Sequence, residues 1–137
     1  MSERIRVLCV DDEIYILNVV KRQLINEPVE VYCVQTAADG LLLIRNLGSV
    51  QVVISDYRMP GMDGMEFLRQ AAILSPGAQC ILLSGFADMG ALDQFQAEER
   101  LYGVLHKPWL ADELRRLIGA AAAVTQRQSE ISPEVRP

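Results

Sequence analysis

The chain has 137 residues, of which 50% are apolar and 23% charged, a composition typical of one globular domain that needs no disulfide or structural metal to fold. Its 13 basic and 18 acidic residues give a net charge of −5, which argues against direct nucleic-acid binding as the main role of this domain. Because no apolar run approaches 18 residues, and residues 7–10 are too short a run for a signal peptide, we expect neither a membrane span nor a leader.

Short apolar runs alternate with segments of helical spacing along most of the chain. Five strands are predicted at residues 5–10, 29–35, 50–55, 79–83 and 101–105. The continuous apolar runs at residues 5–10 and 50–55 indicate burial on both faces, as in a parallel sheet. Apolar residues at helical spacing predict helices at residues 14–24, 37–47, 65–74, 88–98 and 110–124. Asp12 and Asp63 are candidate N-caps, and Gly48 is a candidate helix stop.

The pattern of five strands, each followed by a helix, predicts an α/β fold with a doubly wound parallel sheet and helices on both faces. Periodicity is lost after Val124, and residues 125–137 hold two prolines and only two large apolar residues. We therefore expect one domain over residues 1–124, followed by a flexible tail or linker stub over residues 125–137.

Polar residues stand where four of the five predicted strands end: Asp11 and Asp12, Asp56, Ser84, and Lys107. In such sheets, ligands bind at the carboxyl ends of the strands. Three carboxylates that converge there repel one another unless a cation joins them, and a hard divalent ion such as Mg²⁺ suits oxygen ligands. Asp56 could then act as a nucleophile toward phosphorus, while the metal, Lys107 and Ser84 neutralise or bind the phosphoryl oxygens.

These residues, with their neighbours, resemble the receiver (CheY-like) domain of bacterial two-component response regulators. The resemblance covers about residues 4–124 and rests on Asp11-Asp12-Glu13, the segment DYRMPGMDG at residues 56–64, Ser84-Gly85 and Lys107-Pro108. It implies a flavodoxin-like sheet in the order 2-1-3-4-5. It also implies a cytoplasmic regulatory domain, not an enzyme in its own right, that assists its own Mg²⁺-dependent phosphorylation and dephosphorylation.

By this resemblance, Asp56 accepts a phosphoryl group from a histidine kinase or a phosphotransfer protein. Magnesium would be held by Asp11, Asp12, Asp56 and the main-chain carbonyl of Arg58. Ser84 would be the switch hydroxyl, and Lys107, in a cis bond to its proline, would pair with the acceptor carboxylate and then with the phosphate.

One departure from the family pattern bears on switching, and two side chains that flank the expected phosphoryl group bear on its lifetime. An aromatic residue usually stands three positions before the lysine, where this chain has Val104; Tyr102 should share its face, since side chains alternate along a strand. We therefore expect only a small population shift on phosphorylation. Arg58 and Phe86 stand two positions beyond Asp56 and Ser84, where a long cation and a bulky ring should hinder water, so we expect a long-lived phosphoaspartate.

The resemblance also implies partners that lie outside these residues. The segments 84–88, 107–109 and 112–115 look like a receiver subgroup often joined to HD-GYP phosphodiesterases, so an output domain or downstream protein is expected. Receivers commonly pair through their fourth helix, fifth strand and fifth helix, and a homodimer of that kind would use Leu92, Phe95, Arg100, Arg115 and Arg116.

Three alternatives were weighed against this interpretation. A flavin or dinucleotide site lacks its Gly-x-Gly-x-x-Gly turn after the first strand, and a haloacid-dehalogenase-type phosphatase expects an aspartate where Arg58 stands. A degenerate receiver that serves only as a protein-binding module is disfavoured by the intact set of polar residues. The three cysteines, Cys9, Cys33 and Cys80, are interpreted as buried thiols of a reducing cytosol, and His106 as a strand residue.

Overall fold

A five-stranded parallel sheet forms the centre of the protein. The computed structural model describes residues 4–85 and 101–135. Its strands lie in the order β2-β1-β3-β4-β5, so the predicted sheet order is confirmed. Their bounds are β1 (Ile5–Val10), β2 (Val29–Val34), β3 (Val52–Asp56), β4 (Gln79–Ser84) and β5 (Leu101–His106).

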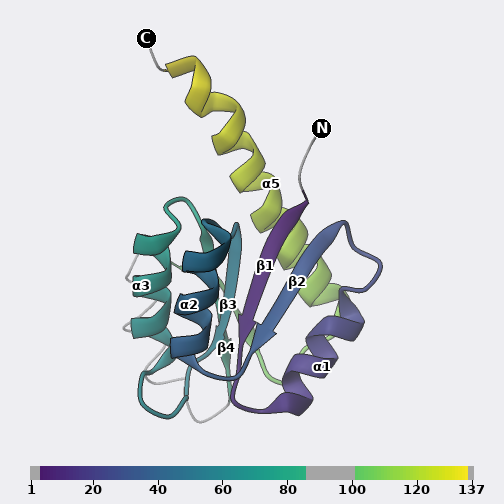
Figure 1. Ribbon diagram of the computed structural model, residues 1–137. Helices are drawn as coiled ribbons and strands as arrows, with labels where there is room; N and C mark the ends of the chain where they lie inside the picture. Colours follow the sequence, from purple (N-terminus) through teal and green to yellow (C-terminus); the bar gives the residue numbers. More distant parts are fainter. Residues whose placement is uncertain (1–3, 86–100, 136–137) are drawn as a thin grey trace.

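The helices cover both faces of the sheet, as the doubly wound pattern predicts (Figure 1). They are α1 (Ile14–Gln23), α2 (Ala37–Leu47), α3 (Gly64–Leu74) and α5 (Ala111–Val135). Helices α2 and α3 pack on one face, while α1 and α5 pack on the other. The helix predicted at residues 88–98 lies outside the described residues. In the part of the chain that the structure describes, no helix is both long and apolar enough to span a membrane.

Two hydrophobic clusters, one on each face, hold these layers together. Alternate residues of β1 point to opposite faces, so Leu8 and Val10 enter the α2/α3 cluster while Val7 and Cys9 enter the α1/α5 cluster. All five residues of β3 are buried. Burial on both faces explains why the central strands are apolar without alternation. Because these strands are parallel, their carboxyl ends lie at the same edge of the sheet.

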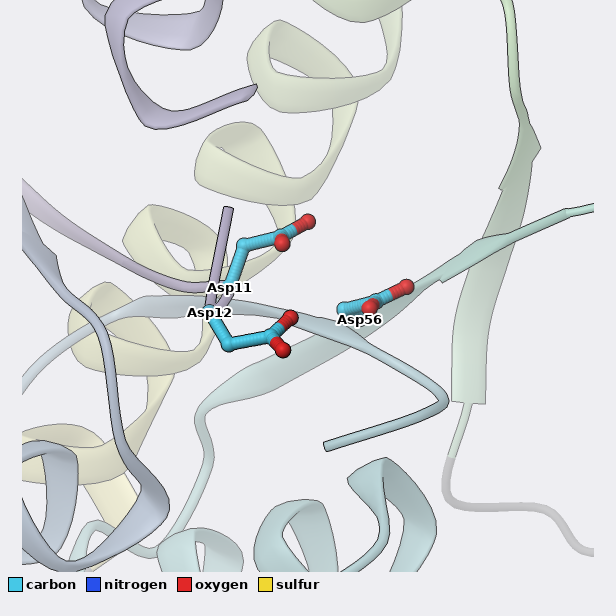
Figure 2. A group of neighbouring side chains, drawn as sticks. All are labelled: Asp11, Asp12 and Asp56. Carbon is cyan, nitrogen blue, oxygen red and sulfur yellow. The ribbon is translucent and has the colours of Figure 1, made fainter. Parts of the chain in front are cut away.

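The helix ends agree with the sequence at two positions and disagree at a third. Asp63 caps α3 by accepting a hydrogen bond from Glu66 N at 2.9 Å, and Gly48 ends α2 with a φ of 87°. The prediction that Asp12 caps α1 is wrong, because Glu13 is the N-cap residue and makes no side-chain capping bond. The Asp12 carboxylate instead lies with those of Asp11 and Asp56 (Figure 2).

A β-bulge interrupts the start of β5. Cys80 pairs with Leu101 and Ile81 pairs with Gly103, so Tyr102 is an extra residue in this strand. A bulge breaks the alternation of side chains. Tyr102 therefore packs with the α1/α5 cluster, whereas Val104 packs with the α2/α3 cluster. The expectation that Tyr102 and Val104 share a face is wrong for this reason.

Helix α5 is longer than the sequence pattern indicated. Its predicted end was Val124, but the helix continues to Val135 and extends beyond the sheet, away from the carboxyl ends of the strands (Figure 1). The apolar spacing is lost because this part of the helix leaves the sheet. The segment still contains good helix formers and has neither Gly nor Pro between residues 120 and 132.

Candidate functional site

An acidic pocket lies at the carboxyl ends of the central strands. Asp11 directly follows β1, and Asp56 is the last residue of β3, the neighbouring strand. One carboxylate oxygen from each of Asp11, Asp12 and Asp56 lies within 4.8 Å of the others. Figure 2 shows the three side chains directed toward a common space. The structure thus brings together the three carboxylates that the sequence placed at this edge.

Lys107 supplies the positive charge of the pocket. Its Nζ lies 3.0 Å from Asp56 Oδ1 and 3.2 Å from Asp11 Oδ2, and the more distant Glu13 Oε1 is at 3.9 Å. The Lys107 main-chain N–H donates to the carbonyl of Ser84 at 2.8 Å, and the following bond to Pro108 is cis. One ammonium therefore bridges carboxylates from two strands.

Burial makes the charged carboxylates costly. Asp11 is fully buried and Asp56 nearly so, with 6% of the residue exposed. Burial raises the pKa of Asp11 to about 6, although the Glu13 N–H lowers it, and the neighbouring Asp56 raises it further. Burial also raises the pKa of Asp56, against the hydrogen bond from Lys107. The pocket therefore holds more negative charge than one ammonium stabilises.

The same surroundings raise the pKa of Lys107, which favours its charged form. Burial lowers its pKa, but the hydrogen bond to Asp56 and the charges of both buried carboxylates raise it more. The ammonium therefore stays protonated. Oxygen ligands, excess negative charge and an edge open to solvent suit a hard divalent cation such as Mg²⁺, which retains several waters.

Ser84 and Arg58 lie at the margins of this pocket. Ser84 ends β4, beside β3, and its buried hydroxyl donates to the Gly85 carbonyl at 3.1 Å. Arg58 stands two residues beyond Asp56, with its guanidinium 5.9 Å from the centre of the Tyr57 ring. Tyr57 and Arg58 help line an open cavity of about 420 Å³ over the loop after β3, together with Met59, Pro60 and Asp63.

Gly64 is a site residue that the sequence reasoning treated only as a turn former. A Cβ here would collide with the main-chain oxygen of Asp56 and lie 2.9 Å from Tyr57 Cα. The Gly64 N–H donates to the Tyr57 carbonyl at 2.8 Å. The start of α3 is thus folded directly against the backbone of Asp56, and only a residue without a side chain permits this approach.

The structure thus defines an α/β domain with a doubly wound parallel sheet and an acidic pocket with one lysine at the carboxyl ends of its strands. The sequence model of the family described as the response regulator receiver domain matches residues 7–119. The chain belongs to this family. The predicted family and fold are therefore confirmed.

Individual relatives are similar to this chain over most of its length. The chain is 30% identical over 130 residues to the hydrogenase transcriptional regulatory protein HoxA of Bradyrhizobium diazoefficiens; this covers 95% of the chain and 26% of the relative. It is 31% identical to the sporulation initiation phosphotransferase F of Bacillus subtilis, covering 80% of the chain and 87% of that protein. The chain thus spans about a quarter of the length of the HoxA regulator.

A solved structure extends the likeness to the fold. The signal receiver domain of an HD domain-containing protein from Pseudomonas fluorescens Pf-5 is 28% identical, with a TM-score of 0.85 and coverage of 95% of each chain. This neighbour is consistent with the subgroup that the motifs of β4 and β5 resemble. Its HD domain belongs to that protein and not to the residues described here.

Replacing Gly64 tests the close approach to Asp56. We expect Gly64→Ala to lower the free energy of unfolding by about 1–3 kcal/mol, because the added methyl group overpacks against backbone that cannot move aside. Urea denaturation measures the difference. Gly119→Ala is the matched control: it is also a helical glycine, but its Cβ would meet nothing within 4 Å, so it should gain stability. A stable Gly64→Ala protein would contradict the proposed contact.

Replacing Asp11 tests the cost of its buried charge. With a pKa of about 6, the folded protein binds a proton that the unfolded chain, near 3.8, has released, so stability falls as pH rises from about 4 through 6. In EDTA at pH 7.5, we expect Asp11→Asn to be more stable than the wild type by about 1–3 kcal/mol. The difference should shrink toward pH 4.5.

The exposed neighbour provides the control for this experiment. Asp12→Asn should change the free energy of unfolding less than Asp11→Asn, because Asp12 is already solvated. Urea titrations at both pH values compare the three proteins. If Asp11→Asn were less stable than the wild type at pH 7.5, the charged Asp11 carboxylate would not destabilise the folded protein, and the prediction would be wrong.

Proposed function

We propose that this chain is the phosphoacceptor domain of a two-component or phosphorelay system, with Asp56 as the acceptor. The observation that carries the proposal is the contact of Lys107 Nζ with Asp56 inside a cluster of three carboxylates. Membership of the receiver family supports the same role. The donor would be a histidine kinase or a phosphotransfer protein, since family members receive phosphoryl groups from such partners.

In this mechanism, a carboxylate oxygen of Asp56 attacks phosphorus, and the bond from phosphorus to the donor breaks with its electron pair leaving on the donor. Asp11, Asp12, Asp56 and the main-chain carbonyl of Arg58 would hold Mg²⁺, which supplies positive charge to the phosphoryl oxygens. Lys107 would move its ammonium from the carboxylates to a phosphoryl oxygen. The Ser84 hydroxyl would rotate away from Gly85 to donate to another.

Exposed apolar side chains border the pocket and suit a protein donor. Ile14 and Tyr15 begin α1 directly after the acidic residues and are 55% and 69% exposed. Leu110, which follows the Lys107–Pro108 segment, is 72% exposed. Exposed apolar side chains of this kind are what the core of a protein interface buries, and a small phosphodonor would need none of them.

The domain organisation is proposed from the relatives and from α5. Residues 1–124 would form the receiver, and residues 125–137 would lead toward an output domain or a separate downstream protein. The chain spans only about a quarter of HoxA, and α5 leaves the sheet at its far end. We propose a cytoplasmic location because its cysteines are free thiols, as in a reducing compartment. Direct nucleic-acid binding by this domain is not proposed.

A homodimer through the fourth helix, β5 and α5 remains a proposal. Of the residues named for it, Leu92, Phe95 and Arg100 lie outside the described part of the chain. Arg115 donates to the Gln23 carbonyl at 3.1 Å and pairs with Asp112 at 2.8 Å, so it is engaged within its own chain. Arg116 is exposed and accessible to a partner.

Switching would differ from the usual two-residue coupling of the family. Val104 packs into the α2/α3 cluster, and the bulge directs Tyr102 to the opposite face. No aromatic side chain of the described part of β5 is thus placed to follow the Ser84 hydroxyl. We therefore retain the proposal of a small population shift, transmitted through the loop after Ser84.

Phosphorylation by a small donor tests the main proposal against a module that only binds proteins. With acetyl phosphate and Mg²⁺, intact mass should show one added phosphoryl group, because a preformed acceptor pocket needs no partner for chemistry. The label should be lost with EDTA and in Asp56→Asn, while Asp39→Asn, an exposed carboxylate on α2, should label normally. Labelling that persists in Asp56→Asn, or a wild type that never labels, would favour the binding module.

The lifetime of the phosphoryl group tests the role of Arg58. Its guanidinium lies over Tyr57 at the rim of the pocket, where it should hinder attacking water. We expect Arg58→Asn to lose the phosphoryl group severalfold faster than the wild type, measured by intact mass over time, and the exposed control Arg116→Asn to be unchanged. A wild-type lifetime of only seconds would contradict this. Phe86, the other proposed shield, lies outside the described residues.

A further inference from the structure

Two of the three cysteines lie side by side in the sheet. Cys9 of β1 and Cys33 of β2 are direct partners in the parallel register, and both side chains belong to the α1/α5 cluster. The Cys33 thiol donates to the Leu17 carbonyl of α1 at 3.9 Å, so it lies on the face of the sheet that Cys9 also faces. Sequence spacing alone gave no indication of this pair, because 23 residues and a whole helix separate the two positions.

The geometry of the pair is close to that of a disulfide. Neighbouring strands are about 4.8 Å apart, and disulfides join Cα atoms that are about 4.4–6.8 Å apart. The Cβ atoms of a disulfide must approach slightly more closely than paired strand residues do. That movement is available because β2 is an edge strand, bonded to the sheet on one side only and partly exposed along its length.

We propose that Cys9 and Cys33 form an intramolecular disulfide under mild two-electron oxidation, making this pair a redox-sensitive modification site. Cys33 is half-buried and accessible from the sheet edge, whereas Cys9 is fully buried. The Cys33 thiol is therefore the group that meets the oxidant. Cytosolic disulfides are characteristically transient and redox-sensing, which suits a thiol pair in a signalling domain.

The chemistry balances with hydrogen peroxide as the oxidant. The Cys33 thiolate attacks one peroxide oxygen, the O–O bond breaks, and hydroxide leaves with the sulfenic acid formed on Cys33. The Cys9 sulfur then attacks the Cys33 sulfur, the S–O bond breaks, and water leaves with the Cys9 proton. Two thiols and one peroxide thus give one disulfide and two waters.

The environment of Cys33 supports its role as the attacking thiol. The neighbouring Cys9 thiol lowers the pKa of Cys33, against the effect of burial, and the nearby Lys21 ammonium lowers it further. Cys80, by contrast, is buried in the α2/α3 cluster on the other face of the sheet, with its thiol 3.9 Å from the Leu68 carbonyl. Cys80 therefore serves as an internal control.

Intact mass after treatment with hydrogen peroxide tests the proposal. The wild type and Cys80→Ser should each lose two hydrogen atoms, regain them with dithiothreitol, and remain monomeric on a non-reducing gel. Cys33→Ser should not lose them; this conservative change at a half-buried edge position spares the buried Cys9. A loss of two hydrogens in Cys33→Ser, a disulfide-linked dimer, or a wild type that gains only oxygen atoms would overturn the proposal.

The pair is also connected to the acidic pocket. Asp11 N donates to the Val34 carbonyl of β2 at 3.2 Å, and Gln35 Nε2 donates to the Asp12 carbonyl at 3.2 Å. Drawing β2 toward β1 should therefore displace the carboxylates and weaken Mg²⁺ binding at least twofold, measured by calorimetry on oxidised and reduced protein.

This consequence rests on the proposed function, whereas the mass measurement does not. Equal Mg²⁺ affinities in the two redox forms would overturn the connection between thiol pair and pocket. Absence of Mg²⁺ binding in the reduced form would count against the metal site of the proposed function, and the disulfide would be judged by mass alone.

Discussion

The structure depends on the confinement of three carboxylates and one ammonium at the edge of a buried sheet. Parallel strands covered on both faces deliver Asp11 and Asp56 to adjacent positions, where little water is present to solvate them. The positive charge of Lys107 balances only part of this negative charge. Burial therefore still raises the pKa of both carboxyls. The resting protein therefore carries electrostatic strain at its site, which a divalent cation would relieve.

Main-chain contacts between neighbouring elements hold the charged residues in place. Gly64 brings the start of α3 against the main chain of Asp56, and the Lys107 N–H binds the end of β4 through the Ser84 carbonyl. Asp56 and the lysine are thus positioned by main-chain contacts between neighbouring elements. Tyr57 and Arg58 follow Asp56 in the chain and line the cavity over the loop after β3.

Much of this architecture could be predicted from the sequence, because strands that are buried on both faces of a sheet are apolar along their length. Apolar and β-branched segments identified the five strands, and the polar residues that follow them identified Asp11, Asp56 and Lys107 as neighbours. The helix caps at Asp63 and Gly48 depend on local residue type, so they too could be predicted from the sequence. The family motifs added the strand order, which periodicity alone does not determine.

The features that escaped prediction are set by contacts between distant segments. Alternation predicted the face of Tyr102, but a bulge depends on how β5 pairs with β4. The pairing of Cys9 with Cys33 depends on strand register, and the need for glycine at position 64 depends on the approach of α3. Asp12 could have capped α1 on local grounds, yet its carboxylate lies with the other acids. The extension of α5 escaped because a helix that leaves the sheet has no apolar stripe.

Because of that extension, a small tilt of α5 displaces the end of the helix by a larger distance. The helix begins just beyond the Lys107–Pro108 segment and has 25 residues, about 37 Å at 1.5 Å per residue. A tilt of about 5° at its base would carry its tip about 3 Å sideways. Even a modest rearrangement around the lysine would thus be magnified into a larger displacement at the far end of the helix.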